Sequence, residues 1–307
     1  MGIKNKNNEY LVDILNFAED TCPDVLIDNV EDIYRAQIFH AVLSSGRKQM
    51  ILLAGPSGSG KTTTARKIKE AMRHIHRTAV VVSMDDFYKN RTELPIIDGK
   101  PNAEVVESLE IELVRKVMND ILATGKASMP QFDFISGVRT DNAYSLDLGA
   151  DGVLILEGIH GLNPIISDGI DSSLIHKVYV SPHSGFCDGK NTVLSKFDLR
   201  FLRRMIRDSW SRGINAEGTF AVWDDVRKSE DLYIRPLGAT ADNTVDTTHA
   251  YEPMAFKHHA LELLGTVSQN SPFSEKAREL EKALSKFREI SGFMIPTESM
   301  LNEFVQL

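Results

Sequence analysis

The chain has 307 residues, of which 42% are hydrophobic and 25% charged, with a formal net charge of −8; this composition is typical of a soluble globular protein and argues against a nucleic-acid partner, which requires a basic surface. Cys22 and Cys187 have no disulfide or metal-ligand spacing. Because no apolar run approaches the ~20 residues that span a bilayer, and the chain does not begin like a signal peptide, we expect a cytoplasmic protein without a membrane partner.

The predicted elements begin with helices over residues 9–20 and 30–44, separated by a break at Cys22-Pro23. After these helices the sequence contains short continuous runs of apolar residues, which are typical of buried parallel strands. They lie at 50–54, 78–82, 152–156, 176–180 and, more weakly, 242–246. Helical patterns separate the runs, at 61–74, 103–123 and 196–212. Strands that alternate with helices predict an α/β fold, a doubly wound parallel sheet of about five strands flanked by helices.

Two further segments complete the predicted organisation. Residues 126–148 indicate a small hairpin insertion, and residues 274–290 a charged amphipathic helix packed on the outside. We divide the chain into an N-terminal helical extension, a nucleotide-binding domain and a C-terminal helical extension, over residues 1–46, 47–265 and 266–307.

The strongest motif follows the first apolar run. Residues 55–62 match the phosphate-loop pattern G-x-x-x-x-G-K-[ST], in which backbone N–H groups and a helix N-terminus surround nucleotide phosphates. A chance glycine-rich turn is the alternative, which the preceding strand and the Gly/Pro-free helical segment after it disfavour. Lys61 would bridge the β- and γ-phosphates, and the Thr62 hydroxyl would bind Mg²⁺. The predicted nucleotide-binding residues of this segment are Gly55, Ser57, Gly58, Ser59, Gly60, Lys61, Thr62 and Thr63.

Acidic residues follow two other predicted strands. Ligands of a doubly wound sheet lie beyond the carboxyl ends of its strands. Asp85, in the segment 83–88, therefore suits a base that accepts a proton from a hydroxyl, with a helix cap as the alternative. Glu157 directly follows a strand, where a carboxylate serves Mg²⁺ in P-loop enzymes.

An arginine-rich helix forms the last predicted part of the site. Arg200, Arg203, Arg204 and Arg207 share about a quarter of a helical wheel. A solvated face partly paired with Asp198 and Asp208 is the alternative, but a bound triphosphate would relieve the repulsion between these like charges. We predict a mobile lid over about 196–215, with Arg204 and Arg207 catalytic and Arg203 and Arg212 binding nucleotide.

Together these motifs resemble the uridine kinase / phosphoribulokinase family of P-loop kinases. The motifs that carry the resemblance are GPSGSGKTT (55–63), SMDDFY (83–88), PQFDFISGVR (130–139), LILEGIHGLNP (154–164) and RFLRRMIRDSWSRG (200–213). The chain is most similar to the kinase part of bacterial uridine kinase-like proteins that often carry an N-terminal TGS domain. The similarity runs from about residue 31 to the C-terminus and includes VRKSEDLYIRPL (226–237) and MIPTESMLNEF (294–304), so no TGS domain is expected. The resemblance implies that Asp85 is the base for a 5′-hydroxyl, that Tyr88 lies near the acceptor, and that Thr62 and Glu157 serve Mg²⁺.

The chain departs from the family pattern where the acceptor would bind. Asn102 stands where uridine kinases have an Asp that holds the ribose hydroxyls, Gly137 replaces a His of the pyrimidine pocket, and Ile214 replaces a second arginine after the lid. The predicted acceptor site comprises Asp85, Tyr88, Asn102, Phe132, Phe134 and Arg139.

The sequence thus predicts an ATP- and Mg²⁺-dependent kinase of a small hydroxyl compound, with a uridine- or cytidine-like nucleoside as the leading acceptor. Two alternatives stay open: the same chemistry on a sugar phosphate or polyol, and a nucleotide-binding regulator or ATPase without a small-molecule acceptor. Formation of a homo-oligomer is also left open by the sequence.

Overall fold

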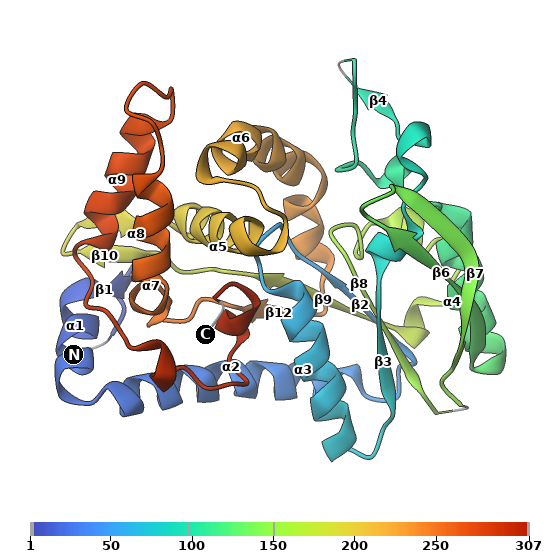
Figure 1. Ribbon diagram of the computed structural model, residues 1–307. Coiled ribbons are helices and arrows are strands. Elements are labelled where there is room, and N and C mark those ends of the chain that lie inside the picture. Colours follow the sequence, from blue (N-terminus) through green and yellow to red (C-terminus); the bar gives the residue numbers. More distant parts are fainter. Residues whose placement is uncertain (1–2, 98, 150, 306–307) are drawn as a thin grey trace.

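A five-stranded parallel sheet lies at the centre of the computed structural model, which describes residues 3–97, 99–149 and 151–305 (Figure 1). In order across the sheet, the strands are β12 (Asn243–Asp246), β9 (Ile175–Ser181), β2 (Met50–Ala54), β8 (Val153–Glu157) and β3 (Ala79–Ser83). The predicted doubly wound sheet is therefore confirmed, and each predicted strand lies within two residues of its observed ends. The first strand of this sheet along the chain, β2, is the central one. The loop that follows β2 therefore lies between the carboxyl ends of its neighbours, β9 and β8.

Both faces of the sheet are covered, which explains why its strands are continuous apolar runs. Successive side chains of β2 point to opposite faces. Ile51 and Leu53 join one hydrophobic cluster, with Ile68 of the helix that follows β2. Leu52 joins the other, with Val117 of the helix that precedes the hairpin. The sheet interior therefore gives rigid positions to whatever follows each strand at its carboxyl end.

The helices alternate with the strands and extend the fold at one side (Figure 1). Their bounds are α1 (Val12–Thr21), α2 (Pro23–Ser45), α3 (Lys61–His74), α4 (Ile111–Thr124), α5 (Lys196–Ser211), α6 (Ala216–Tyr233), α7 (Glu252–Ala255), α8 (Lys257–Gly265) and α9 (Ser274–Leu284). The predicted insertion at 126–148 is the antiparallel hairpin of β6 (Lys126–Asp133) and β7 (Val138–Asp147).

Several boundaries differ from the sequence prediction. The helix predicted from residue 103 starts at Ile111; before it, the Asn102 side chain accepts from the Glu104 N–H, and Val106–Ser108 form a short 3-10 turn. The second helix starts at Pro23 and not at residue 30, since proline is well tolerated in a first helical turn. Two small sheets were not predicted, since strands of two to four residues carry little periodicity: β1 (Tyr10–Leu11), β10 (Phe186–Asp188) and β11 (Asn191–Leu194) form one, and β4 (Ile96–Ile97) and β5 (Lys100–Pro101) the other.

The two predicted extensions share a core with the central domain. One hydrophobic cluster contains residues of all three ranges, among them Ile38, Leu202 and Phe304. In Figure 1 the last described turn of the chain, residues 300–305, lies in the middle of the molecule, between the labels α3 and α7. The division at residues 46 and 265 stays a prediction about sequence units. Among the described residues, no helix combines the length and apolar character that crossing a bilayer demands.

Candidate active site

The phosphate loop connects β2 to α3 and has the backbone that its glycines allow. Gly58 and Gly60 have φ of +69° and +83°, in the left-handed region that other residues avoid. A Cβ on Gly55 would lie 2.0 Å from the carbonyl oxygen of Val180, so the loop starts tight against β9. The loop ends at the N-terminus of α3, where unpaired N–H groups and the helix dipole favour an anion.

Lys61, Thr62 and Glu157 meet at the floor of a cavity of about 200 Å³. The Thr62 hydroxyl donates to Glu157 Oε1 at 3.2 Å, because β2 and β8 are neighbours in the sheet. Burial raises the pKa of Glu157 to about 7, against the opposing effect of the Lys61 ammonium. Burial likewise lowers the pKa of Lys61, which Glu157 partly counteracts. Lys61 Nζ donates to the Pro56 carbonyl at 3.2 Å and stays at the cavity wall.

Asp85 follows β3 in a short 3-10 turn and faces the same cavity. Burial raises the pKa of its carboxyl group, and Lys61 acts in the opposite direction. Its neighbour Asp86 points elsewhere and accepts from the Phe132 N–H at 3.3 Å, which fastens the β6–β7 hairpin. Of the two adjacent acids, the first is thus the one at the cavity. Tyr88 lines the wall beside it.

A single buried carboxylate gathers three arginines at the opposite wall. Asp208 is fully buried, and Arg204, Arg207 and Arg212 lie 3.1, 3.3 and 3.2 Å from it. All three arginines line the cavity, and Arg204 also donates to the Ser57 hydroxyl at 2.9 Å. Three cations share one acid, so positive charge remains available for a polyanion beside the phosphate loop.

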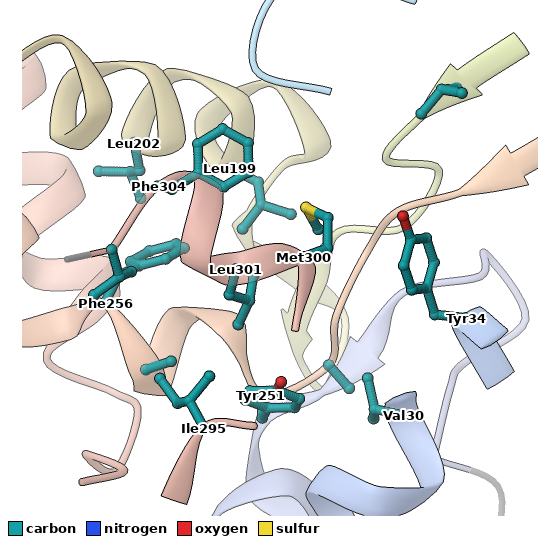
Figure 2. Packing of buried hydrophobic residues seen from close by; sticks show 14 of the residues in the cluster. Val30, Tyr34, Leu199, Leu202, Tyr251, Phe256, Ile295, Met300, Leu301 and Phe304 are labelled. Carbon is teal, nitrogen blue, oxygen red and sulfur yellow. The ribbon is translucent and has the colours of Figure 1, made fainter. Parts of the chain in front are cut away.

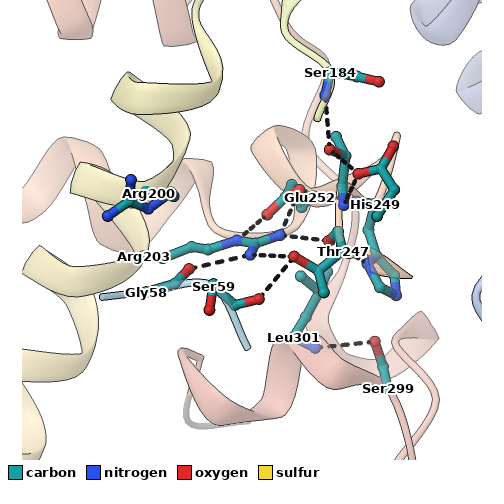
Figure 3. Close-up of polar contacts among 12 residues, drawn as sticks. Gly58, Ser59, Ser184, Arg200, Arg203, Thr247, His249, Glu252, Ser299 and Leu301 are labelled. Carbon is teal, nitrogen blue, oxygen red and sulfur yellow. Dashed lines mark hydrogen bonds and ion pairs between the residues drawn. The ribbon is translucent and has the colours of Figure 1, made fainter. Parts of the chain in front are cut away.

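The structure corrects the role predicted for Arg203. Its guanidinium is fully buried, donates to both oxygens of Glu252 at 2.6 and 2.9 Å, and reaches the Gly58 carbonyl at 3.2 Å (Figure 3). Arg200 is buried in the same way, in an ion pair with Glu230. These two arginines support the phosphate loop from behind and do not face the cavity. The apolar face of α5 is buried as well, so this helix is packed against the core in the structure, and the mobility predicted for the lid stays a prediction.

The predicted acceptor residues separate into two layers. Asp85 and Tyr88 line the cavity, whereas the remaining four do not. Phe132 packs on Tyr88 with ring centroids 5.9 Å apart, Phe134 on Phe132 at 5.1 Å, and Arg139 donates to the Tyr88 carbonyl at 2.8 Å. They therefore hold Tyr88 in place from outside the cavity.

Asn102 is displaced from the predicted position for a local reason. Its side-chain oxygen accepts from the Glu104 N–H at 2.8 Å, the turn that Asn commonly forms with the backbone two residues on. Glu104 consequently takes the place at the cavity wall, and burial raises the pKa of its carboxyl group. Gly55 and Thr63 also lie outside the lining set, beneath the loop and in the first turn of α3.

Sequence reasoning missed two acids of this site, Glu104 and Glu303. The pairing of the arginines with Asp208, which the sequence offered as part of the alternative interpretation, is present; its position i+4 from Arg204 predicts this contact on one helix. Glu303 lies 240 residues beyond its partner Thr63, a separation that no local pattern reports.

His160, which follows the Glu157 strand end, gives the site loop a pH-dependent stability. The side chain is buried, and burial lowers its pKa to about 4, against opposing contributions from Glu104, Glu107 and Val105. The unfolded chain, with a His pKa near 6.5, binds this proton more readily between pH 6.5 and 4. The stabilisation is therefore full above pH 6.5 and is lost as pH falls through 4.

We expect the free energy of unfolding of wild type to fall by roughly 2 kcal/mol more than that of His160→Gln between pH 7 and pH 5. Urea unfolding of both proteins at the two pH values measures this difference. An identical pH dependence of the two proteins would show that His160 is already charged in the folded state.

The residues present also fit a magnesium ion. Mg²⁺ is usually held by one or two protein groups together with phosphates and waters, and Thr62 with Glu157 supplies such a pair beside the phosphate loop. Within the described ranges, no group of three or more His, Cys, Asp or Glu side chains gathers as a metal site. A bound Mg²⁺ would supply neutralisation of the phosphate charge.

The phosphate loop at the start of a five-stranded parallel sheet defines the class of the protein, a P-loop NTPase fold. Residues 50–252 match the profile of the phosphoribulokinase / uridine kinase family. Over 198 residues, the chain is 28% identical to a uridine kinase of Ureaplasma parvum (64% of this chain, 86% of that protein) and 30% identical to one of Staphylococcus aureus (63% and 84%).

Among solved structures, the fold is similar to a protein of Silicibacter sp. TM1040 assigned as a fructose transport system kinase, with a TM-score of 0.50 and 19% identity over 69% of this chain and 97% of that one. This likeness concerns the fold alone. Because the family profile covers about two thirds of the chain, the protein belongs to the phosphoribulokinase / uridine kinase family and is a phosphotransferase that acts on a hydroxyl group.

Proposed function

We propose that the protein transfers the γ-phosphate of ATP, with Mg²⁺, to a hydroxyl group of an uncharged small molecule, and that this acceptor is a nucleoside of the uridine or cytidine kind. The observation that carries the proposal is that Asp85 faces the same cavity as Lys61 and the phosphate loop. An acid opposite a triphosphate site suits an acceptor that loses a proton. The curated relatives named uridine kinase support the nucleoside.

In the proposed reaction, the acceptor oxygen attacks the γ-phosphorus in line, and the bond from that phosphorus to the β–γ bridging oxygen breaks. The acceptor proton passes to the Asp85 carboxylate, whose raised pKa brings it closer to the pH at which proton transfer is effective. Lys61, Arg204 and Arg207 stabilise the negative charge on the phosphates as ADP departs. Thr62 and Glu157 hold the metal.

Two carboxylates on the acceptor side support an uncharged alcohol over a sugar phosphate. Asp85 and Glu104 both line the cavity, and a phosphate group on the acceptor would have to compete with the donor phosphates for the arginines of the same cavity. Hydroxyl groups, by contrast, donate to carboxylates in strong hydrogen bonds. A polyol remains a second candidate, because Phe132 and Phe134 stand outside the lining set and leave Tyr88 as the aromatic available for a flat base.

A panel of acceptors tests the proposal. The protein would be incubated with Mg²⁺-ATP and separately with uridine, cytidine, a polyol and a sugar phosphate, and ADP formation followed. Strong stimulation by a pyrimidine nucleoside is expected. Stimulation by the polyol alone would favour the second candidate, and a slow rate that no acceptor changes would favour a regulatory ATPase.

Glu104→Gln is expected to raise the KM of the acceptor about tenfold or more while kcat changes less, because an amide replaces a charged hydrogen-bond acceptor. Steady-state kinetics with the best acceptor of the panel measures both constants. Glu107→Gln is the matched control, since Glu107 is exposed three residues away. An unchanged KM in Glu104→Gln would remove this residue from acceptor binding.

A further inference from the structure

The end of the chain folds back over the phosphate loop. Beyond Ile295, a segment leads into the short 3-10 helix η8 (Met300–Glu303), and Met300, Leu301 and Phe304 are fully buried (Figure 2). Figure 2 shows them among side chains of α5 and α2 and the residues that flank α7, Tyr251 and Phe256. The family profile matches residues 50–252, so this segment lies beyond the part of the chain that the profile matches.

Two contacts place η8 on the nucleotide side of the loop. The Glu303 carboxylate accepts from the backbone N–H of Thr63 at 3.2 Å. Met300 lies against the loop itself, since a Cβ on Gly60 would be 2.8 Å from the Met300 sulfur. Glu303 also lines the cavity together with Lys61.

The position of Glu303 is one that a nucleotide phosphate needs. In phosphate loops of this pattern, the backbone N–H groups and the first turn of the following helix surround the α- and β-phosphates. Thr63 is in that first turn, and its N–H is already given to a carboxylate of the same chain. Two anions cannot share the donor, and a carboxylate beside a phosphate repels it.

The small size of the cavity is a second indication that Glu303 and a nucleotide phosphate compete for the same place. Its volume is about 200 Å³, whereas pockets for small-molecule ligands are generally about 300–1,000 Å³. The phosphates of a nucleotide would therefore have to share this small space with the Glu303 side chain, which lines it. Glu303 is the one residue of the described lining that lies beyond residue 252, where the family profile ends.

We propose that residues 295–305 form an intramolecular plug of the donor-nucleotide site, in which the Glu303 carboxylate occupies a phosphate position and must leave before a nucleotide binds. The affinity for nucleotide is then reduced by the fraction of molecules in which the plug is closed. Trp210 of α5 donates its indole N–H to the Phe304 carbonyl at 3.0 Å, so plug opening also breaks this contact between the segment and α5.

The first test is the affinity for Mg²⁺-ADP, measured by isothermal titration calorimetry without any acceptor. Glu303→Gln is expected to bind ADP about tenfold more tightly than wild type, the factor that one charge-assisted hydrogen bond is worth. Glu298→Gln is the control, since Glu298 lies on the same segment but its side chain is 83% exposed, and its affinity should equal that of wild type. An equal or weaker affinity of Glu303→Gln would overturn the proposal.

The second test measures the opening of residues 295–305 by backbone hydrogen exchange of wild type, with and without saturating Mg²⁺-ADP. The amides of Phe304 and Val305 both donate to the Leu301 carbonyl and are expected to exchange faster when ADP is bound. Slower or unchanged exchange at saturation would overturn the plug. Neither test depends on phosphoryl transfer, so a failed acceptor panel and a failed plug remain distinguishable.

Discussion

Asp85→Asn is expected to lower kcat by about a thousandfold while leaving the affinity for Mg²⁺-ATP within a few-fold of wild type. General-base catalysis by a positioned side chain is worth about 10²–10⁴ in rate, and an amide of the same shape cannot accept the proton. The donor side is untouched, because the phosphate loop and the arginines of α5 belong to other elements. Single-turnover kinetics with the best acceptor, together with calorimetric titration of ATP, measures the two quantities.

Asp86→Asn is the matched control for this substitution. Asp86 carries the same charge one position later, but its carboxylate is bonded to the Phe132 N–H and not directed at the cavity. Its kcat should therefore stay within a few-fold of wild type. Near-normal turnover of Asp85→Asn, or an equal loss in both variants, would contradict the assignment of Asp85 as the base.

Arg203→Met is expected to reduce the free energy of unfolding by about 3–5 kcal/mol, because it leaves the fully buried Glu252 without its partner. Replacing both residues, as Arg203→Met with Glu252→Leu, should recover much of the loss, since a buried ion pair is often replaceable by apolar groups. Urea unfolding of the single and double variants measures these differences.

Arg212→Met serves as the comparison for stability. The Arg212 side chain is 51% exposed, so its ion pair with Asp208 should contribute about 1 kcal/mol or less. If Arg203→Met instead unfolded like wild type and lost affinity for ATP, Arg203 would be the nucleotide ligand that the sequence predicted, and its burial behind Gly58 would be a conformation that the nucleotide reverses.

The structural features that depend on residues close together in the sequence were predicted well. The runs at 50–54 and 152–156 are apolar throughout because both faces of the sheet are covered, and this property needs no knowledge of partners. The phosphate loop is recognisable because its glycines and Lys61 act through backbone geometry within eight residues. Asp85 and Glu157 could be placed at the same edge because the carboxyl ends of parallel strands meet there.

What depends on distant partners could not be predicted. A helical wheel grouped Arg200, Arg203, Arg204 and Arg207, yet it cannot show that Arg200 and Arg203 meet buried acids, Glu230 and Glu252, supplied by later helices. The sequence also placed Asn102 at the cavity, where the structure has Glu104. The Asn102 side chain instead accepts a hydrogen bond from the backbone N–H of Glu104 in a local turn.

Ser83 pairs with Glu157 across β3 and β8, and this pairing separates the part of the site that can change its acceptor specificity from the part that cannot. Backbone hydrogen bonds in the sheet interior fix the spacing between Glu157 and Asp85, two residues beyond Ser83. Glu104 and Phe132 belong instead to a loop and a hairpin outside the sheet. Substitutions in those segments can alter which alcohol is accepted, while the relative positions of Asp85 and Glu157, on which phosphoryl transfer depends, stay the same.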